Sequence, residues 1–286
     1  MKKILLLFIF ISGLFSAQNR FIYDYKFVAD STNRDDVKSE LMYLDINEKG
    51  SKFYSREVYV SDSTMTAMFE KQIKATGGMN VDMKAISMRK GSVRYKIYKN
   101  YPNFETYSLT RLGMDAYKIA DKRPIVWKIL SDKQKIGNWE TQKATTEFAG
   151  RKWIAWFTEE LPFQDGPYKF RGLPGLIVKL EDATQSHIFE LKAVGKYKEE
   201  VQKVSEFVGN EKEIEINQEQ YKKLFLEERN DPAKSLKMAV ANGAVLQFRD
   251  GSGNEISPSE MIKRREQQAK ENNKRDNNLI ELDLLK

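Results

Sequence analysis

The sequence contains no cysteine and only one histidine, His187. Without thiols the chain forms no disulfide bond, carries no lipidated amino-terminal cysteine and offers no thiolate ligand to zinc. A single imidazole is too few for a zinc site built from histidines. We therefore predict no metal site and no cofactor, and we expect His187 to be a packed or half-exposed strand residue.

The local patterns of nucleophilic catalysis and of calcium binding are also missing. There is no Gly-x-Ser-x-Gly segment and no EF-hand loop. Paired carboxylates are the remaining route to bond cleavage, and the candidates are Glu159, Glu160 and Asp165. They lie close in sequence to two tryptophans, a combination that suits sugar binding or cleavage. Solvated acids in a turn between strands are the simpler interpretation.

Long apolar runs are absent except at the amino terminus. Residues 1–17 combine Lys2 and Lys3 with a short apolar core and end in small residues at Ala17, which is the pattern of a signal peptide. The run is short for a membrane span. We expect cleavage near Ala17 and a soluble mature protein that is periplasmic or secreted.

No stretch concentrates charge of one sign. The formal net charge of +7 arises from 48 basic and 41 acidic residues, which is a mild excess. An exported protein without a basic, aromatic groove is not expected to bind nucleic acid. Association with an outer membrane and the oligomeric state stay open.

Alternation of apolar and polar residues is what the chain does contain. Phe21, Tyr23 and Tyr25 alternate with polar residues, as in a half-buried strand. Similar segments between turn signals predict further strands over residues 41–47, 53–61, 93–97, 104–112, 114–119, 125–129, 139–148, 151–157, 176–180, 187–193 and, in a charge-rich region, 203–208. This succession predicts a mainly β (α+β) fold, a curved antiparallel meander or half-open barrel.

Helical signals are fewer and most lie near the carboxyl end. Spacing predicts a short helix over 65–73, and Asn217 with Gln220 and Ser257 with Glu260 form capping patterns of two later helices. We divide the chain into a signal peptide (1–17), an antiparallel β domain (18–210), a helical or irregular packing segment (211–256) and a polar helix and tail (257–286). We expect this last part to be solvated or frayed.

The most specific stretch runs from 148 to 182. Residues 151–157 carry large apolar groups on both faces of a predicted strand, which suits a strand covered on both sides. Pro174 and Gly175 predict a type II turn over 173–176, because proline presets φ at its second position and glycine accepts a positive φ at its third. Gly172 is expected to allow a close backbone approach.

A family resemblance enters at this turn. Its residues are Gly172, Leu173, Pro174, Gly175, Leu176 and Ile177, and they spell GLPGLI. With the flanking segments AGRKWIAWFTEELP and DGPYKF, the chain resembles the GLPGLI family of exported bacterial proteins. The resemblance implies a compartment and no activity, because the family has no established one. A weaker similarity, to the bowl-like amino-terminal domain of a secreted peptide N-glycanase, implies a half-open β architecture and an accessory role.

These observations favour an exported, non-catalytic binding or accessory protein, with the GLPGLI segment as a structural turn. The ligand would be a small apolar molecule, a sugar or a protein. The candidate binding residues are Trp153, Trp156, Arg151 and Arg171, and the two arginines are expected to pair with acids of the loop between them. The alternative is a carboxylate-dependent hydrolase acting on carbohydrate or glycopeptide. Aromatic residues on the concave face would either line a bowl or fill an ordinary core.

Overall fold

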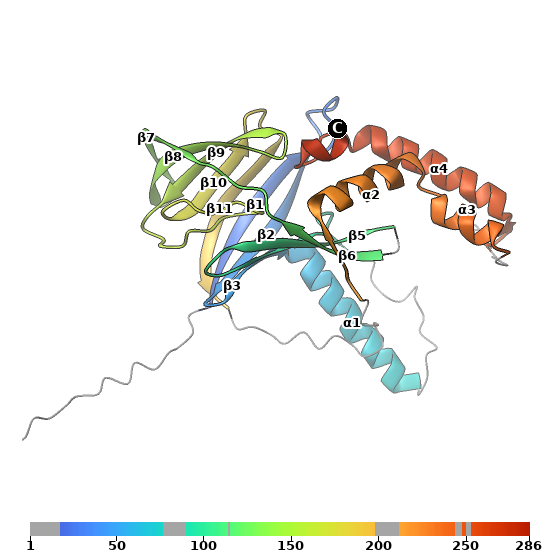
Figure 1. The fold of residues 1–286 in the computed structure, drawn as a ribbon. Helices are drawn as coiled ribbons and strands as arrows, with labels where there is room; N and C mark the ends of the chain where they lie inside the picture. Colours follow the sequence, from blue (N-terminus) through green and yellow to red (C-terminus); the bar gives the residue numbers. More distant parts are fainter. Residues whose placement is uncertain (1–17, 77–89, 114, 198–211, 244–247, 250–252) are drawn as a thin grey trace, which may run out of the picture.

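One open sheet of twelve strands dominates the computed structural model, which describes residues 18–76, 90–113, 115–197, 212–243, 248–249 and 253–286 (Figure 1). The strand order is β12-β6-β5-β4-β3-β2-β1-β11-β10-β9-β8-β7. The pairs are antiparallel except for β12 with β6, which is parallel. The predicted mainly β fold with helices at the carboxyl end is confirmed, as a mixed sheet that does not close.

The strands of this sheet are β1 (Asn19–Val28), β2 (Val37–Asn47), β3 (Gly50–Ser55), β4 (Lys96–Asn100), β5 (Glu105–Leu112), β6 (Asp115–Asp121), β7 (Lys128–Ile136), β8 (Trp139–Phe148), β9 (Arg151–Thr158), β10 (Leu176–Asp182), β11 (His187–Lys196) and β12 (Ile214–Asn217). A separate pair joins β13 (Phe248–Arg249) to β14 (Glu255–Ile256). Strand β1 lies between β2 and β11, so the first strand of the sheet links early and late parts of the chain.

The predicted strand over 53–61 is wrong beyond its third residue. Strand β3 ends at Ser55, and helix α1 (Arg56–Thr76) follows at once. The Ser55 hydroxyl accepts a hydrogen bond from the Val58 N–H at 3.1 Å, which satisfies one of the free donors of the first helical turn. Serine followed by Glu57 in that turn is a helix-start signal that outweighs the strand-like alternation.

Two other strands are shifted from their predicted positions. Strand β4 begins at Lys96 rather than at residue 93, because the Val93 N–H donates to the Glu40 carboxylate. Strand β7 begins at Lys128 rather than at residue 125, after Trp127, whose indole N–H donates to the Arg171 carbonyl at 2.8 Å. The predicted segment 203–208 lies outside the described residues.

The carboxyl-terminal helices are α2 (Gln218–Asn230), α3 (Lys234–Ala241) and α4 (Pro258–Arg275). The capping box of Asn217 with Gln220 and the Ser257 cap form as predicted. No residue of α4 is buried, but the tail behind it is not frayed: it docks on the sheet, where Asn278, Glu281 and Leu284 are buried and η1 (Leu282–Leu285) forms. Among the described residues, no helix is both long and apolar enough to traverse a membrane.

The sheet has two unlike faces. One face carries the hydrophobic cluster, with Phe21, Tyr23, Leu44, Phe53, Ile97, Trp153, Phe157, Leu180 and Phe189 among its members. We call this the core face. Because side chains alternate along a strand, the residues between these members point to the opposite side, which we call the outer face.

Candidate functional site

Residues 159–175, which connect β9 to β10, form the signature loop, and this loop folds over the core face. Its Phe163 ring packs on Phe21 with centroids 5.2 Å apart, and its Phe170 ring packs on Trp153 at 4.8 Å. Phe170 and Trp153 are at most 1% exposed. Around these rings the core face is therefore filled by the chain's own aromatic side chains.

Lys99 binds the signature loop from the core face of the sheet. Its ammonium group, on β4, donates to the carbonyl oxygens of Gly166 at 2.7 Å and Tyr168 at 3.1 Å and forms an ion pair with Asp165. Both charged side chains are fully buried. Burial lowers the pKa of Lys99 despite the opposing effect of the Asp165 charge. The Tyr101 hydroxyl also donates to Asp165, so this acid is held on two sides.

The turn within the hexapeptide differs from the predicted type II turn. The Gly175 N–H donates to the Leu173 carbonyl at 2.8 Å, two residues back, and the Leu176 N–H donates to the Leu161 carbonyl at 3.0 Å. A type II turn would send the Leu176 N–H to Leu173 instead. Here the Leu176 N–H donates to Leu161 instead. The turn is closed by the hydrogen bond from Gly175 to Leu173, which spans three residues rather than four.

Gly175 has the positive φ predicted for it, at +158°, but the close backbone approach predicted for Gly172 occurs at Gly175 instead. A Cβ atom on Gly175 would lie 2.1 Å from the Thr158 carbonyl oxygen, so this is the position of close backbone approach. Gly172 has φ +90° with open space around it, so it supplies a positive φ and no close approach. Together the two positions let the loop return tightly against the end of β9.

The three candidate catalytic acids do not converge. Glu159 and Glu160 are exposed, and Glu160 accepts a hydrogen bond from the Glu140 N–H at 3.0 Å. Asp165 is fully buried against Lys99. A glycosidic site needs two facing carboxyl groups with room for a sugar between them, and these three acids do not provide one.

The candidate binding residues are mostly enclosed. Trp156 is 8% exposed, and the Lys143 ammonium lies 5.7 Å from its ring. Arg151 pairs with Asp182 on β10 at 3.0 Å, and Arg171 donates to the Phe104 carbonyl at 3.2 Å. The expected ion pairs with acids of the loop are therefore wrong for both arginines, because Lys99 neutralises the buried loop acid. Their predicted role in ligand binding stays a prediction.

A second buried charge cluster joins the signature loop to the tail. The Glu281 carboxylate accepts hydrogen bonds from Lys169 at 2.5 Å, Tyr168 at 2.6 Å and Arg123 at 2.9 Å. Asp121 on β6 accepts from the same two cations, at 2.8 and 2.6 Å. Burial raises the pKa of Glu281, but the charges of Lys169 and Arg123 lower it further, so the net shift is downward.

His187 lies beside this region and is neutral. Its Nε2 atom is 2.9 Å from the Asn278 carbonyl oxygen, which can only accept, so Nε2 carries the proton. Its Nδ1 atom then accepts from the Tyr25 hydroxyl at 2.7 Å. Burial, reinforced by the charge of Arg151, lowers the pKa of His187 to about 4. The prediction of a packed histidine is confirmed: its side chain is 2% exposed.

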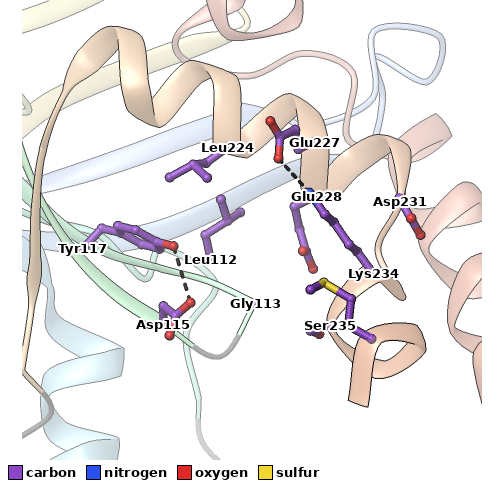
Figure 2. Close-up of a pocket in the computed structure, with 11 residues that line it drawn as sticks. Leu112, Gly113, Asp115, Tyr117, Leu224, Glu227, Glu228, Asp231, Lys234 and Ser235 are labelled. Carbon is purple, nitrogen blue, oxygen red and sulfur yellow. Dashed lines mark hydrogen bonds and ion pairs between the residues drawn. The ribbon is translucent and has the colours of Figure 1, made fainter. Parts of the chain in front are cut away.

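A hollow of about 220 Å³ lies between the β5–β6 hairpin and helices α2 and α3. Figure 2 shows Asp115 and Tyr117 on the hairpin side and Glu227 and Glu228 on the helix side. All four acids that line it are engaged: Asp115 accepts from the Tyr117 hydroxyl at 3.4 Å, Glu227 pairs with Lys234 at 3.1 Å, Asp231 with Lys237 at 2.7 Å and Glu228 with Arg265 at 3.8 Å. This hollow collects carboxylates at a place that the sequence did not indicate.

Rings and cations alternate across the outer face of β1 to β6, an arrangement that we call the tyrosine ladder. Its members are Arg20, Tyr43, Tyr54, Lys52, Tyr98, Tyr107 and Lys118. Arg20 lies 4.1 Å from the Tyr43 ring centroid, and Lys118 lies 5.0 Å from that of Tyr107. The Tyr98 and Tyr107 rings stack at 4.9 Å. Tyr54 is buried, whereas the other rings are half-buried.

The ladder and the buried charges were missed for different reasons. Lys99 follows Tyr95 and Ile97 with a period of two, so the alternation could have placed it on the core face. The alternation does not show that Lys99 is paired with Asp165. Nothing in the sequence pairs Glu281 with Lys169, which is 112 residues away. The ladder needs the strand order, because its neighbouring rings come from different strands.

The comparisons with known proteins agree with the resemblance. Residues 149–179 match the model of the GLPGLI family, which is described as a protein of unknown function (Porph_ging). No curated protein matches the chain. Among solved structures, two crystal forms of PNGF-II, a peptide N-glycanase, are similar, with TM-scores of 0.51 and 0.50 and 15% identity. Each match covers 75% of this chain and 34% of PNGF-II, so the chain spans about a third of that protein, and the likeness concerns the fold alone.

Proposed function

We propose that this protein is an exported, non-catalytic binding or accessory protein, and that the tyrosine ladder is its binding surface. The observation that carries the proposal is the run of rings and cations across six strands on the outer face. Flat apolar ring faces combined with N–H donors suit a sugar chain that carries acidic groups. A small apolar molecule or a protein is the other ligand class to be tested.

The state of the candidate acids supports a non-catalytic role. Asp165 is enclosed with Lys99, and Glu159 and Glu160 lie exposed and apart from it. In this proposal the hexapeptide is a structural turn that fixes the signature loop against β9. The signal-peptide pattern of residues 1–17 supports export to the periplasm or beyond, where association with an outer membrane would bring the ladder to surface glycans.

The test uses the purified mature chain from Gln18 and a panel of neutral polysaccharides, acidic polysaccharides, peptides and lipid vesicles. We expect saturable binding of an acidic polysaccharide in calorimetry, weakened about tenfold or more by the double substitution Tyr98→Ala and Tyr107→Ala. Val126→Ala, which removes an exposed apolar side chain ahead of β7 and away from both candidate sites, is the control and should bind like the wild type. Equal binding by the ladder variant would contradict the proposal.

The alternative is a carboxylate-dependent hydrolase of carbohydrate or glycopeptide, and the hollow in Figure 2 is the observation that favours it. Asp115 and Glu228 approach that hollow from opposite sides. If the wild type releases product from such substrates, and Asp115→Asn and Glu228→Gln each abolish the release while the ladder variant does not, then the alternative replaces the proposal.

A further inference from the structure

The last residues of the chain lie along the core face as a segment that we call the tail (residues 277–285), which has no regular secondary structure up to Glu281 and ends in η1. Its backbone is tied to the sheet at both ends. The N–H groups of Asn277 and Asn278 donate to the Ala29 carbonyl at 3.2 and 3.0 Å, and the Asp283 N–H donates to the Ala149 carbonyl at 3.3 Å. The tail thus runs from the end of β1 to the turn between β8 and β9.

Two side chains of the sheet donate hydrogen bonds to the backbone of the tail. Arg151 donates through Nε to the Leu279 carbonyl at 3.0 Å, and His187 donates through Nε2 to the Asn278 carbonyl at 2.9 Å. Neither contact depends on the identity of the tail side chain. Among the tail side chains, Glu281 makes the most charged contacts, since its carboxylate accepts from a lysine, an arginine and a tyrosine. The Asn278 amide oxygen also accepts from Arg151 at 2.7 Å, and Asp283 pairs with Arg123 at 2.9 Å.

The cations of this site keep partners that do not belong to the tail. Arg151 pairs with Asp182, and Lys169 and Arg123 both pair with Asp121. Three cations therefore share two acids outside the tail, which leaves an excess of one positive charge in a largely buried place. An unbalanced buried charge is costly, so the site favours an anionic group at the position of Glu281.

The tail itself is attached with little apolar burial. Leu284 is its only apolar side chain that is fully buried, and Ile280 is partly buried against the core. Helix α4, which leads into the tail, buries none of its residues. Polar contacts therefore hold the tail, and a peptide that offers the same contacts can compete for them.

We propose that the core face holds a peptide-binding site for an acidic peptide, and that the tail is its occupant from the same chain. An acidic segment of a partner protein would bind by replacing the tail. The recognition set is Arg151 and His187 for two successive backbone carbonyls, with Lys169, Arg123 and Tyr168 for the carboxylate. This site lies on the opposite face of the sheet from the tyrosine ladder and does not depend on the function proposed above.

The test uses the full mature chain and a fluorescent peptide with the sequence of residues 277–286. In Glu281→Gln the chain's own tail competes less well, so we expect this variant to bind the peptide at least about tenfold more tightly than the wild type does. The same peptide carrying glutamine at the position of Glu281 should not bind. Glu271→Gln, which makes the same change on the exposed helix α4, should behave like the wild type. Equal affinities of Glu281→Gln and the wild type, or equal binding of the two peptides, would overturn the proposal.

A second measurement covers the case in which Glu281→Gln does not fold. Amide hydrogen exchange of the wild-type chain follows the N–H groups of Asn277, Asn278 and Asp283 and those of β1. We expect the tail amides to exchange at least about a hundredfold faster than the β1 amides, through a local opening, and faster still with excess peptide present. Exchange of the tail only together with β1, unaffected by the peptide, would make the tail an integral part of the core and overturn the proposal.

Discussion

The core face and the outer face of the same strands use lysine in opposite ways. On the core face, Lys99 is 0% exposed and is surrounded by backbone carbonyls and Asp165. On the outer face, Lys118 is half-buried, with 37% of its side chain exposed, and it contacts one tyrosine ring and Glu215. A buried ammonium group must have all its water replaced by protein oxygens, whereas an exposed one keeps its water. The core-face charges therefore determine the positions of the loop and the tail, whereas Lys118 on the outer face keeps part of its surface in water.

The largest effect should follow from breaking the Lys99 pair. Lys99→Met leaves the Asp165 carboxylate buried without its cation, and we expect the free energy of unfolding to fall by about 3–5 kcal/mol. Lys118→Met, the same change on the outer face, should leave the free energy of unfolding nearly unchanged, because water screens this charge. Urea unfolding of both variants measures the difference. Equal losses would mean that the two faces do not differ as described.

A double variant sharpens this comparison. Adding Asp165→Asn to Lys99→Met removes the unpaired charge, so the double variant should be more stable than Lys99→Met alone. Strict additivity of the two single losses would show that Lys99 stabilises the loop through its carbonyl contacts and not through the ion pair.

The second largest effect concerns the hexapeptide. Gly175→Val places a side chain where even a Cβ atom would lie 2.1 Å from the Thr158 carbonyl oxygen, so we expect a loss of roughly 3 kcal/mol. Gly172→Ala, with open space but a φ of +90°, should cost about 1–2 kcal/mol. Thermal unfolding of the two variants ranks them. A Gly175→Val protein with unchanged stability but lost ligand binding would make the turn a functional site.

Local patterns predicted the parts of the fold that local physics determines. The alternation of Phe21, Tyr23 and Tyr25 located β1, because one buried face imposes a period of two. The caps at Asn217 and Ser257 located the starts of α2 and α4, because orphan N–H groups need nearby acceptors. The Ser55 cap carried the same signal, but it stood inside a strand-like run and was overlooked.

Contacts between residues far apart in the chain could not be predicted from the sequence. The carbonyls that Lys99 binds lie 67 to 71 residues further along the chain, and only the strand order brings β4 beneath the signature loop. The docking of the tail is of the same kind, since its polar composition alone indicated a solvated end. Where the candidate site is built from pairs distant in sequence, periodicity can place a residue on a face but cannot name its partner.

A third effect is a pH dependence that arises on the core face. The pKa of His187 is lowered from 6.5 to about 4, mainly by burial and also by Arg151, so the folded chain resists a proton that the unfolded chain accepts. Stability is therefore complete above pH 6.5 and is lost as the pH falls toward 4. Between pH 7 and pH 5 we expect a loss of about 2 kcal/mol, measured by urea unfolding.

We assign the change in stability between pH 7 and pH 5 to His187. The pKa values of Asp182 and Glu281 are lowered, so their contributions are lost only below the ordinary carboxyl range. As the chain has one histidine, His187→Asn should lower stability at pH 7, because the Tyr25 hydroxyl loses its acceptor, and should flatten the curve between pH 7 and pH 5. A slope that persists in this variant would show that another group takes up the proton between pH 7 and pH 5, and the assignment of this window to His187 would be wrong.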